Sequence, residues 1–225
     1  MRELWTEVYR PKTVDEYVFT NTSTREQVED WIKQKSIPHL LLYGPAGTGK
    51  TTLAKVLINQ LEIDNFDVLH VNASRDNGVD FLKSKIEGFV STMPFGEFRY
   101  VIIDEFDGFT HDAQAGLRSM MEEYSNIARF ILTANYAHKI IPAIKSRCQT
   151  FEIQSLDRAQ YMERIAKILM QEGIDLTEEN LEILDDYVSA AYPDLRKCIN
   201  LLQQNCTNNT LKRPDNSTAT GTSTY

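Results

Sequence analysis

A glycine-rich segment that ends in lysine and threonine directly follows the apolar residues 40–43. It reads Gly44, Pro45, Ala46, Gly47, Thr48, Gly49, Lys50, Thr51. Glycines let the backbone turn so that successive N–H groups point inward, and such a turn at a helix N-terminus binds phosphate. The lysine reaches the β- and γ-phosphates, and the hydroxyl after it binds Mg²⁺. The segment therefore predicts a P-loop for ATP that also includes Thr52, against the alternative of a plain glycine turn.

Two adjacent carboxylates, Asp104 and Glu105, follow the apolar residues 101–103. Because parallel strands end at the same edge of a sheet, these carboxylates are expected to lie beside the glycine-rich loop. Asp104 would hold Mg²⁺ together with Thr51, and Glu105 would polarise the water that attacks ATP. The alternative for such a pair is an ordinary solvated strand end.

Asn135 follows residues 131–134, which read Ile-Leu-Thr-Ala, and so repeats the arrangement with a neutral side chain. An amide there can hydrogen-bond the attacking water or the γ-phosphate without adding repulsive charge. The common alternative use of asparagine at such a position is to form a turn.

The elements that position these residues follow from hydrophobic periodicity. Strands are expected at residues 40–43, 68–71, 100–103 and 130–133, with a last strand around Phe151 and Ile153. Helices are expected from a capping box at Ser23–Glu26 to near Ser36, and over residues 51–61, 79–90 and 112–124. This alternation predicts an α/β fold with a parallel five-stranded sheet flanked by helices.

After Gln154 the pattern contains helices only, over residues 158–171, 178–190 and 195–205. We therefore expect an ATPase domain at 1–154 and a small three-helix domain at 155–206. Residues 207–225 are rich in Thr, Asn and Ser, and they are expected to form a disordered polar tail.

Composition limits the classes of function. The 225 residues carry a net charge of −8, so any nucleic-acid contact has to come from a local basic patch. The three cysteines form no Cys-x-x-Cys pair, which argues against structural zinc and secreted disulfides. No apolar stretch approaches the roughly 18 residues of a membrane span, so we expect a cytoplasmic protein without a membrane partner.

The motifs occur together in the order and spacing of clamp-loader ATPases of the AAA+ class, which the sequence resembles over residues 5–206. The motifs are GPAGTGKT (44–51), IIDEFD (102–107), TAN (133–135) and SRC (146–148), with Tyr9-Arg10-Pro11 near the start. The small subunits of replication factor C and the large subunit of T4-like bacteriophage clamp loaders show this pattern. The resemblance implies an AAA+ P-loop fold whose helical domain is a lid, with ATP and Mg²⁺ as cofactors.

The resemblance also assigns further roles. Arg147 matches the arginine finger that reaches ATP bound by a neighbouring subunit, although a lone arginine is more often a surface cation. Arg196 resembles a second sensor on the lid, with an ordinary helix charge as the alternative. The segment that packs near the adenine corresponds to Val8, Tyr9, Arg10 and Pro11.

DNA contact is expected on the helix at residues 79–90. Lys83 lies where the family uses a basic residue to meet the DNA backbone, and Lys85 lies beside it; a solvated helix face is the alternative. Gln114 and Arg118 resemble residues that couple DNA contact to Glu105.

The implied activity is ATP hydrolysis, stimulated by DNA and clamp, that opens a sliding clamp and loads it onto primer–template DNA. The implied partners are other loader subunits in a hetero-oligomeric ring or spiral, the clamp and the DNA. For a viral protein, the location would be the host cytoplasm. The helical collar domain that follows the lid in such subunits does not occur in this sequence, which puts stable assembly in doubt. The alternatives are another AAA+ DNA motor, of the branch-migration or initiator type, and a truncated module that binds nucleotide without hydrolysing it.

Overall fold

The computed structural model describes residues 3–75, 78–207 and 210–213. The chain forms two compact units. One is Pro11–Gln154, and the other joins the described residues of Met1–Arg10 to those of Ser155–Tyr225. Residues 3–10, which belong to the part of the chain assigned to the ATPase domain from the sequence, therefore pack with the helical unit instead. No helix among the described residues is long and apolar enough to cross a membrane.

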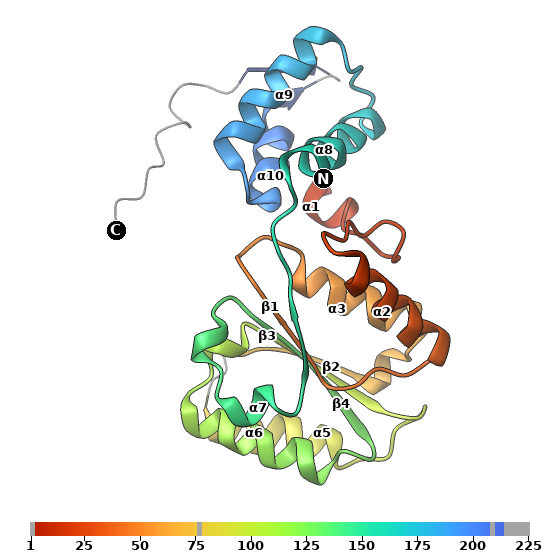
Figure 1. The fold of residues 1–225 in the computed structure, drawn as a ribbon, viewed down its shortest axis with the longest axis vertical. Helices are drawn as coiled ribbons and strands as arrows, with labels where there is room; N and C mark the ends of the chain where they lie inside the picture. Colours follow the sequence, from red (N-terminus) through yellow and green to blue (C-terminus); the bar gives the residue numbers. More distant parts are fainter. Residues whose placement is uncertain (1–2, 76–77, 208–209, 214–225) are drawn as a thin grey trace. The chain divides into compact units, whose positions relative to one another are not determined.

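A five-stranded parallel sheet forms the middle of the first unit, as predicted (Figure 1). Its order is β2-β3-β4-β1-β5, and the strands pair in parallel throughout. The strands are β1 (Leu40–Tyr43), β2 (Val68–Asn72), β3 (Arg99–Asp104), β4 (Ala128–Ala134) and β5 (Gln149–Glu152). The predicted strand around Ile153 ends one residue earlier than expected.

Alternating side chains divide the core between the two faces of the sheet. Leu41 points to one face, into a cluster that includes Ile103 and Leu117, whereas Leu40 and Leu42 point to the other. Figure 1 shows α2 and α3 on one side of the sheet and α5, α6 and α7 on the other. The helices are α2 (Thr22–Gln34), α3 (Lys50–Gln60), α4 (Val79–Phe81), α5 (Gly88–Val90), α6 (His111–Glu123) and α7 (Pro142–Lys145).

Two local details of the first unit differ from expectation. The predicted capping box at Ser23 is wrong, because α2 begins at Thr22 and the Asn21 side chain accepts a hydrogen bond from Ser23 N. The predicted helix at residues 79–90 contains a π-helical segment, η2 (Leu82–Glu87), between α4 and α5. Short 3₁₀ turns are η1 (Asn65–Asp67), η3 (Phe106–Gly108) and η4 (Ala137–Lys139).

The second unit contains α8 (Arg158–Gln171), α9 (Glu178–Ala191) and α10 (Leu195–Asn205), close to the expected ranges. The short helix α1 (Trp5–Val8) joins them, because Trp5 is buried in the same apolar cluster. Asp157, Thr177 and Asp194 cap the N-termini of the three long helices with side-chain oxygens.

The first residues of the expected tail belong to this unit. β6 (Cys206–Thr207) pairs antiparallel with β7 (Thr210–Leu211), and Leu211 is 3% exposed. Tyr187 Oη donates a hydrogen bond of 2.7 Å to the Lys212 carbonyl. The prediction of disorder from residue 207 is therefore wrong for 207 and 210–213, because one leucine reaches the apolar core. The rest of the predicted tail, 208–209 and 214–225, lies outside the described residues.

Candidate nucleotide site

The glycine-rich loop joins β1 to α3, and its glycines adopt conformations that other residues rarely reach. Gly44, Gly47 and Gly49 have φ angles of 148°, 79° and 96°. A Cβ on Gly44 would lie 2.2 Å from the Ile153 carbonyl oxygen, and one on Gly49 would lie 3.2 Å from Tyr17 Oη. The loop is therefore held against its neighbours where only glycine fits.

Lys50 begins α3 and is buried. Its Nζ donates hydrogen bonds to the carbonyl oxygens of Gly44 (2.9 Å) and Pro45 (2.7 Å). The ammonium group thus lies within the loop, at the N-terminal end of a helix, where the helix dipole also favours an anion. Lysine, loop and helix together form a site suited to phosphate.

Asp104 ends β3 and receives hydrogen bonds on both carboxylate oxygens. Thr51 Oγ1 and Thr133 Oγ1 donate to Oδ1 over 2.7 and 2.8 Å, and His70 Nε2 lies 2.6 Å from Oδ2. Burial raises the pKa of Asp104, but the hydrogen bonds from His70, Thr51 and Thr133 outweigh it, so the pKa lies below its ordinary value. Asp104 is therefore held as a carboxylate.

The oxygens of Thr51 and Asp104 suit a magnesium ion. Both are hard donors, they lie 2.7 Å apart, and they are positioned by different elements, α3 and β3. Mg²⁺ prefers one or two such protein oxygens together with the phosphates of a nucleotide. These two residues would hold the ion.

Glu105 is exposed and adopts a left-handed backbone conformation, with φ of 54°. Its N–H donates to Thr133 Oγ1 over 3.2 Å, and its carbonyl oxygen accepts a bond from Gly108 N. Left-handed non-glycine residues cost about 1–3 kcal/mol and concentrate at functional sites. Because of this conformation, the chain leaves the direction of strand β3 at Glu105.

Asn135 follows β4, which lies between β3 and β1 in the sheet. Asp107 accepts hydrogen bonds from the backbone N–H groups of Asn135 (3.3 Å) and Tyr136 (3.2 Å). The loop, the acidic pair and Asn135 therefore follow strand ends, as predicted, and the three strands are neighbours in the sheet. The role of the Asn135 side chain stays a prediction.

Arg147 lies where the parallel strands begin, at the opposite end of the strands from the glycine-rich loop. It precedes β5, whose first residue Gln149 pairs with Leu40, the first residue of the parallel strand β1. The loop begins beyond the other end of β1, about 13 Å away for a four-residue strand. Arg147 instead forms an ion pair with Glu122 and donates to the Ala143 carbonyl oxygen (2.8 Å).

Helix α6 connects these segments. Gln114 is buried; its Nε2 donates to the carbonyl oxygens of Phe109 and Lys139, and its Oε1 accepts from Ile141 N. Arg118, one turn further on, forms an ion pair with Glu122. Gln114 therefore ties α6 to the last residue of η4 and to Ile141, just before α7, in the segment that leads from Asn135 to Arg147.

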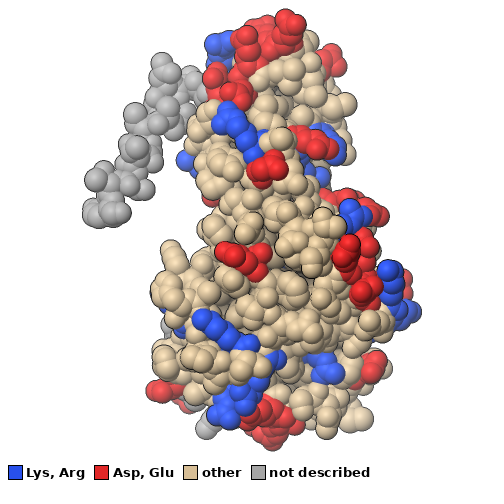
Figure 2. All heavy atoms as spheres, in the orientation of Figure 1, with Lys and Arg blue, Asp and Glu red and all other residues tan. Residues whose placement is uncertain are grey.

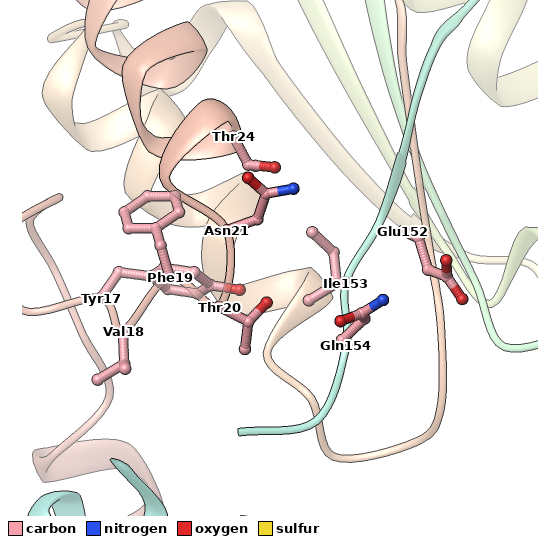
Figure 3. A pocket seen from close by; sticks show the side chains of 9 residues that line it. All are labelled: Tyr17, Val18, Phe19, Thr20, Asn21, Thr24, Glu152, Ile153 and Gln154. Carbon is pink, nitrogen blue, oxygen red and sulfur yellow. The ribbon is translucent and has the colours of Figure 1, made fainter. Parts of the chain in front are cut away.

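A small hollow lies next to the loop, between residues 17–24 and the chain that leaves β5 (Figure 3). Two of its lining residues, Tyr17 and Ile153, are the ones that approach Gly49 and Gly44. Figure 3 shows Thr20, Asn21 and Gln154 presenting polar groups from the two sides. The hollow therefore lies near the place where the nucleoside of a bound nucleotide is expected.

The remaining predicted residues lie elsewhere. Val8, Tyr9, Arg10 and Arg196 belong to the second unit, so their contact with a nucleotide stays a prediction. Tyr9 Oη donates to Glu172 there (2.5 Å), and Arg196 is an exposed residue at the start of α10. Lys85 is exposed and lies 5.3 Å from the Phe81 ring centre, whereas the Lys83 side chain is outside the described residues.

Sequence reasoning missed His70, Asp107 and the contacts of Thr133. His70 is a polar residue within an apolar strand, and Asp107 lies in the acidic motif, so both were visible as types. Their contacts become visible only in the structure. His70 and Thr133 reach Asp104 because β2 pairs with β3 and β3 pairs with β4, and Asp107 accepts a hydrogen bond from the backbone N–H of Asn135.

Comparison with known proteins agrees with this geometry. The sequence model of the family "ATPase family associated with various cellular activities (AAA)" matches residues 40–156. The replication factor C small subunit of Thermofilum pendens is 42% identical over 205 residues, covering 89% of this chain and 62% of the relative. Those of Aeropyrum pernix and Archaeoglobus fulgidus are each 41% identical, covering 89% of this chain and 62% and 63% of the relatives. The chain thus spans just over three fifths of these relatives.

Solved structures support the fold. The Holliday junction branch migration motor RuvB of Thermotoga maritima has a TM-score of 0.69 at 16% identity, covering 88% of this chain and 66% of that chain. A mutant form of the same protein has a TM-score of 0.71, also at 16% identity, covering 86% and 64%. At this identity the likeness concerns the fold alone. With the matched family model, the glycine-rich loop and the paired carboxylates, the chain belongs to the AAA family of ATPases.

Proposed function

We propose that this chain is an ATP-hydrolysing subunit of a DNA sliding-clamp loader. The observation that carries the ATPase part is the convergence of Lys50, Thr51 and Asp104 at one edge of the sheet, with Glu105 beside them. The similarity to replication factor C small subunits supports the clamp-loader part.

Phosphate binding would use groups that the loop already holds. Lys50 would exchange the Gly44 and Pro45 carbonyl oxygens for phosphate oxygens. Thr51 and Asp104 would hold Mg²⁺, which neutralises phosphate charge when bound. The nucleoside would lie beside Tyr17, Thr20 and Gln154, next to the small hollow that they line. Val8, Tyr9, Arg10, Pro11 and Arg196 would contact the nucleotide, as the resemblance to clamp-loader subunits implies.

Glu105 would orient and polarise the attacking water, with Asn135 as its neutral partner on the next strand end. The exposed, left-handed Glu105 supports this role, because a carboxylate directed out of the strand can reach a water beyond the γ-phosphate.

Completion of the site requires a second subunit. Arg147 lies at the opposite end of the strands from its own P-loop, so it is suited to act on ATP bound by a neighbour. Figure 2 shows lysines and arginines gathering over α6 and α7, and the basic residues of this region are Arg118, Lys139, Lys145 and Arg147. Such a surface favours contact with a nucleotide's phosphates.

DNA would be bound by the helical segment that carries Lys83 and Lys85. With an overall charge of −8, a local basic surface is needed for phosphate contact, and primer–template DNA is the ligand that the clamp-loader role requires.

The clamp would be bound by an apolar surface that lies just before the starts of strands β2 and β3. Phe66, Met93 and Phe95 are 74%, 80% and 77% exposed, more than any other large apolar side chain in the described ranges. The Phe66 and Phe95 rings lie 5.7 Å apart. An apolar group of this kind indicates a protein-binding surface.

A buried ion pair makes this surface rigid. Asp67 accepts hydrogen bonds from the N–H groups of Phe95 (2.9 Å) and Gly96 (2.7 Å), and Arg99 Nη1 lies 2.9 Å from Asp67 Oδ1. Arg99 also donates to the Met93 carbonyl oxygen (2.6 Å). The apolar side chains are therefore exposed on a fixed backbone, which lowers the entropy lost on binding.

The clamp surface is tested by Met93→Ser combined with Phe95→Ser. We expect binding to a candidate clamp to weaken at least tenfold while nucleotide affinity stays unchanged. Met170→Ser is the matched control, because Met170 is 60% exposed on α8. Equal clamp binding by all three proteins would exclude this surface.

The proposed function is tested by ATP turnover with and without primer–template DNA, clamp and partner subunit. Glu105→Gln should bind ATP but lose stimulated turnover, and Arg147→Ala should reduce the stimulated turnover of ATP bound by the neighbouring subunit by about 10³–10⁵-fold. Turnover stimulated by branched DNA but not by the clamp would favour a DNA motor of another kind. Nucleotide binding without turnover in every combination would indicate a non-hydrolysing module.

A further inference from the structure

The carboxylate of Asp104 has a third hydrogen-bond partner that the nucleotide site does not explain. Thr51 and Thr133 share Oδ1, whereas His70 Nε2 lies 2.6 Å from Oδ2. Since a carboxylate only accepts hydrogen bonds, Nε2 of His70 carries the proton and donates it. The two oxygens of one carboxylate are thus held from opposite sides.

The sheet register brings these side chains together. His70 pairs with Ile102, and Asn72 pairs with Asp104, on the parallel strands β2 and β3. His70 and Asp104 are therefore diagonal neighbours on one face, a separation that a long side chain can span. β2 is the outer strand of the sheet, so the His70 side chain is 42% exposed while that of Asp104 is 11% exposed.

Fixing Oδ2 has a consequence for Oδ1. A carboxylate held at one oxygen only can rotate about its χ2 torsion, which is broad for aspartate. With His70 on Oδ2, rotation would break a hydrogen bond, so Oδ1 stays directed at Thr51. Residues that hydrogen-bond a metal ligand in this way commonly change metal affinity by 10–100-fold.

We propose that His70 is a positioning residue that holds Asp104 for Mg²⁺ and so tightens the binding of the Mg²⁺–nucleotide complex. The inference rests on the proposed ATP site, because it assigns Asp104 to the metal. It concerns binding of the metal with nucleotide and requires neither hydrolysis nor a clamp.

The test compares His70→Gln with His70→Leu. The glutamine amide can donate to Oδ2 from a similar reach, whereas leucine cannot donate. The measurement is the Mg²⁺ concentration that gives half of the full increase in affinity for a fluorescent ADP analogue, with the affinity in EDTA measured separately. We expect the Mg²⁺ requirement to rise about tenfold or more in His70→Leu and to stay near wild type in His70→Gln. Affinity in EDTA should be equal in all three.

Three results would overturn the proposal: an unchanged Mg²⁺ requirement in His70→Leu, a loss of affinity in EDTA as large as the loss with Mg²⁺, or no difference between Gln and Leu. If His70→Leu does not fold, His70→Ala removes the same donor and is judged by the same results. His111→Leu, on the exposed first turn of α6, is the control for loss of a histidine. Absence of ATP turnover in the wild type would contradict the proposed function but leave this test unaffected.

Discussion

Thr133 contacts both residues of the acidic pair, through the carboxylate of Asp104 and the backbone N–H of Glu105. Its Oγ1 donates to Asp104 Oδ1 over 2.8 Å and accepts from the Glu105 N–H over 3.2 Å, and the residue is 2% exposed. One hydroxyl thus orients the proposed magnesium ligand and supports the left-handed backbone of Glu105. A hydroxyl can donate one hydrogen bond and accept another, as both contacts here require.

Replacing Thr133 with valine should therefore impair both stability and catalysis. Valine has nearly the same shape but leaves the partly buried Glu105 N–H and one Asp104 oxygen without this partner, which costs about 1–3 kcal/mol. We expect a lower urea midpoint and at least a tenfold loss of ATP turnover. Thr133→Ser keeps the hydroxyl and should retain most turnover. Equal turnover in the two variants would show that the hydroxyl has no catalytic part.

At the scale of the element, the P-loop depends on glycine at one position more than at the others. Gly44 has φ of 148°, and an added Cβ would lie 2.2 Å from the Ile153 carbonyl oxygen, which is backbone and cannot rotate away. The contact joins the start of the loop to the chain leaving β5. A side chain at this position would have to displace one of the two segments.

Gly44→Ala should consequently lower the free energy of unfolding by more than about 2 kcal/mol and abolish nucleotide binding. Gly88→Ala is the matched control, since Gly88 has a helical φ of −56° and an added Cβ there would meet nothing within 4 Å. That variant should gain roughly 0.5–1 kcal/mol from helix propensity. For each variant, urea unfolding measures the stability and nucleotide titration measures the binding. A Gly44→Ala protein as stable as wild type would contradict the close approach.

Another element-scale contact fixes the amino ends of two strands and depends on pH. His39 Nδ1, just before β1, accepts a hydrogen bond of 3.2 Å from Phe130 N on β4, so the ring is neutral. Burial, and then the charge of Arg129, lowers the pKa of His39 from 6.5 to about 4. The unfolded chain takes up a proton near pH 6.5 and the folded chain only near pH 4, so stability is lost as pH falls between these values.

The expected loss from His39 is on the order of 3 kcal/mol over that pH range. His39→Asn keeps an acceptor for Phe130 N but does not titrate, so its free energy of unfolding should fall less steeply with acid. Urea unfolding at several pH values between 7 and 4 measures the difference. Parallel curves for the two proteins would mean that the pKa of His39 is the same in the folded and unfolded states, and would contradict this prediction.

The sequence predicts the elements of this fold well for a physical reason. Residues 40–43 and 101–103 are apolar on both faces, which is typical of a buried parallel strand, and the P-loop requires a strand before it and a helix after it. Contacts between elements cannot be predicted from such patterns. The pairing of His70 with Asp104 needs the strand order, and the cap at Asn21 rather than Ser23 depends on a single side-chain rotamer.

At the scale of the whole molecule, the first and the last described residues belong to the same unit. Gln203 on α10 accepts a hydrogen bond from Trp5 N (3.0 Å) and donates to the Glu3 carbonyl oxygen (2.7 Å). Arg164 on α8 donates to the Tyr9 carbonyl oxygen (2.5 Å). Periodicity could not predict this, because residues 1–20 show none and their assignment depends on a partner about 200 positions away.

The place of the first residues can be tested with Trp5→Ala. Trp5 is 6% exposed among the side chains of α8, α9 and α10, so its removal should cost about 3–5 kcal/mol in the helical unit. Hydrogen exchange should accelerate in peptides from α8 and α10 and stay unchanged in β1, β3 and β4. Leu4→Ala, at a side chain that is 61% exposed, is the control and should alter neither. Faster exchange in the strands of the sheet would instead assign residues 3–10 to the first unit, because local destabilisation spreads through the elements that a side chain packs against.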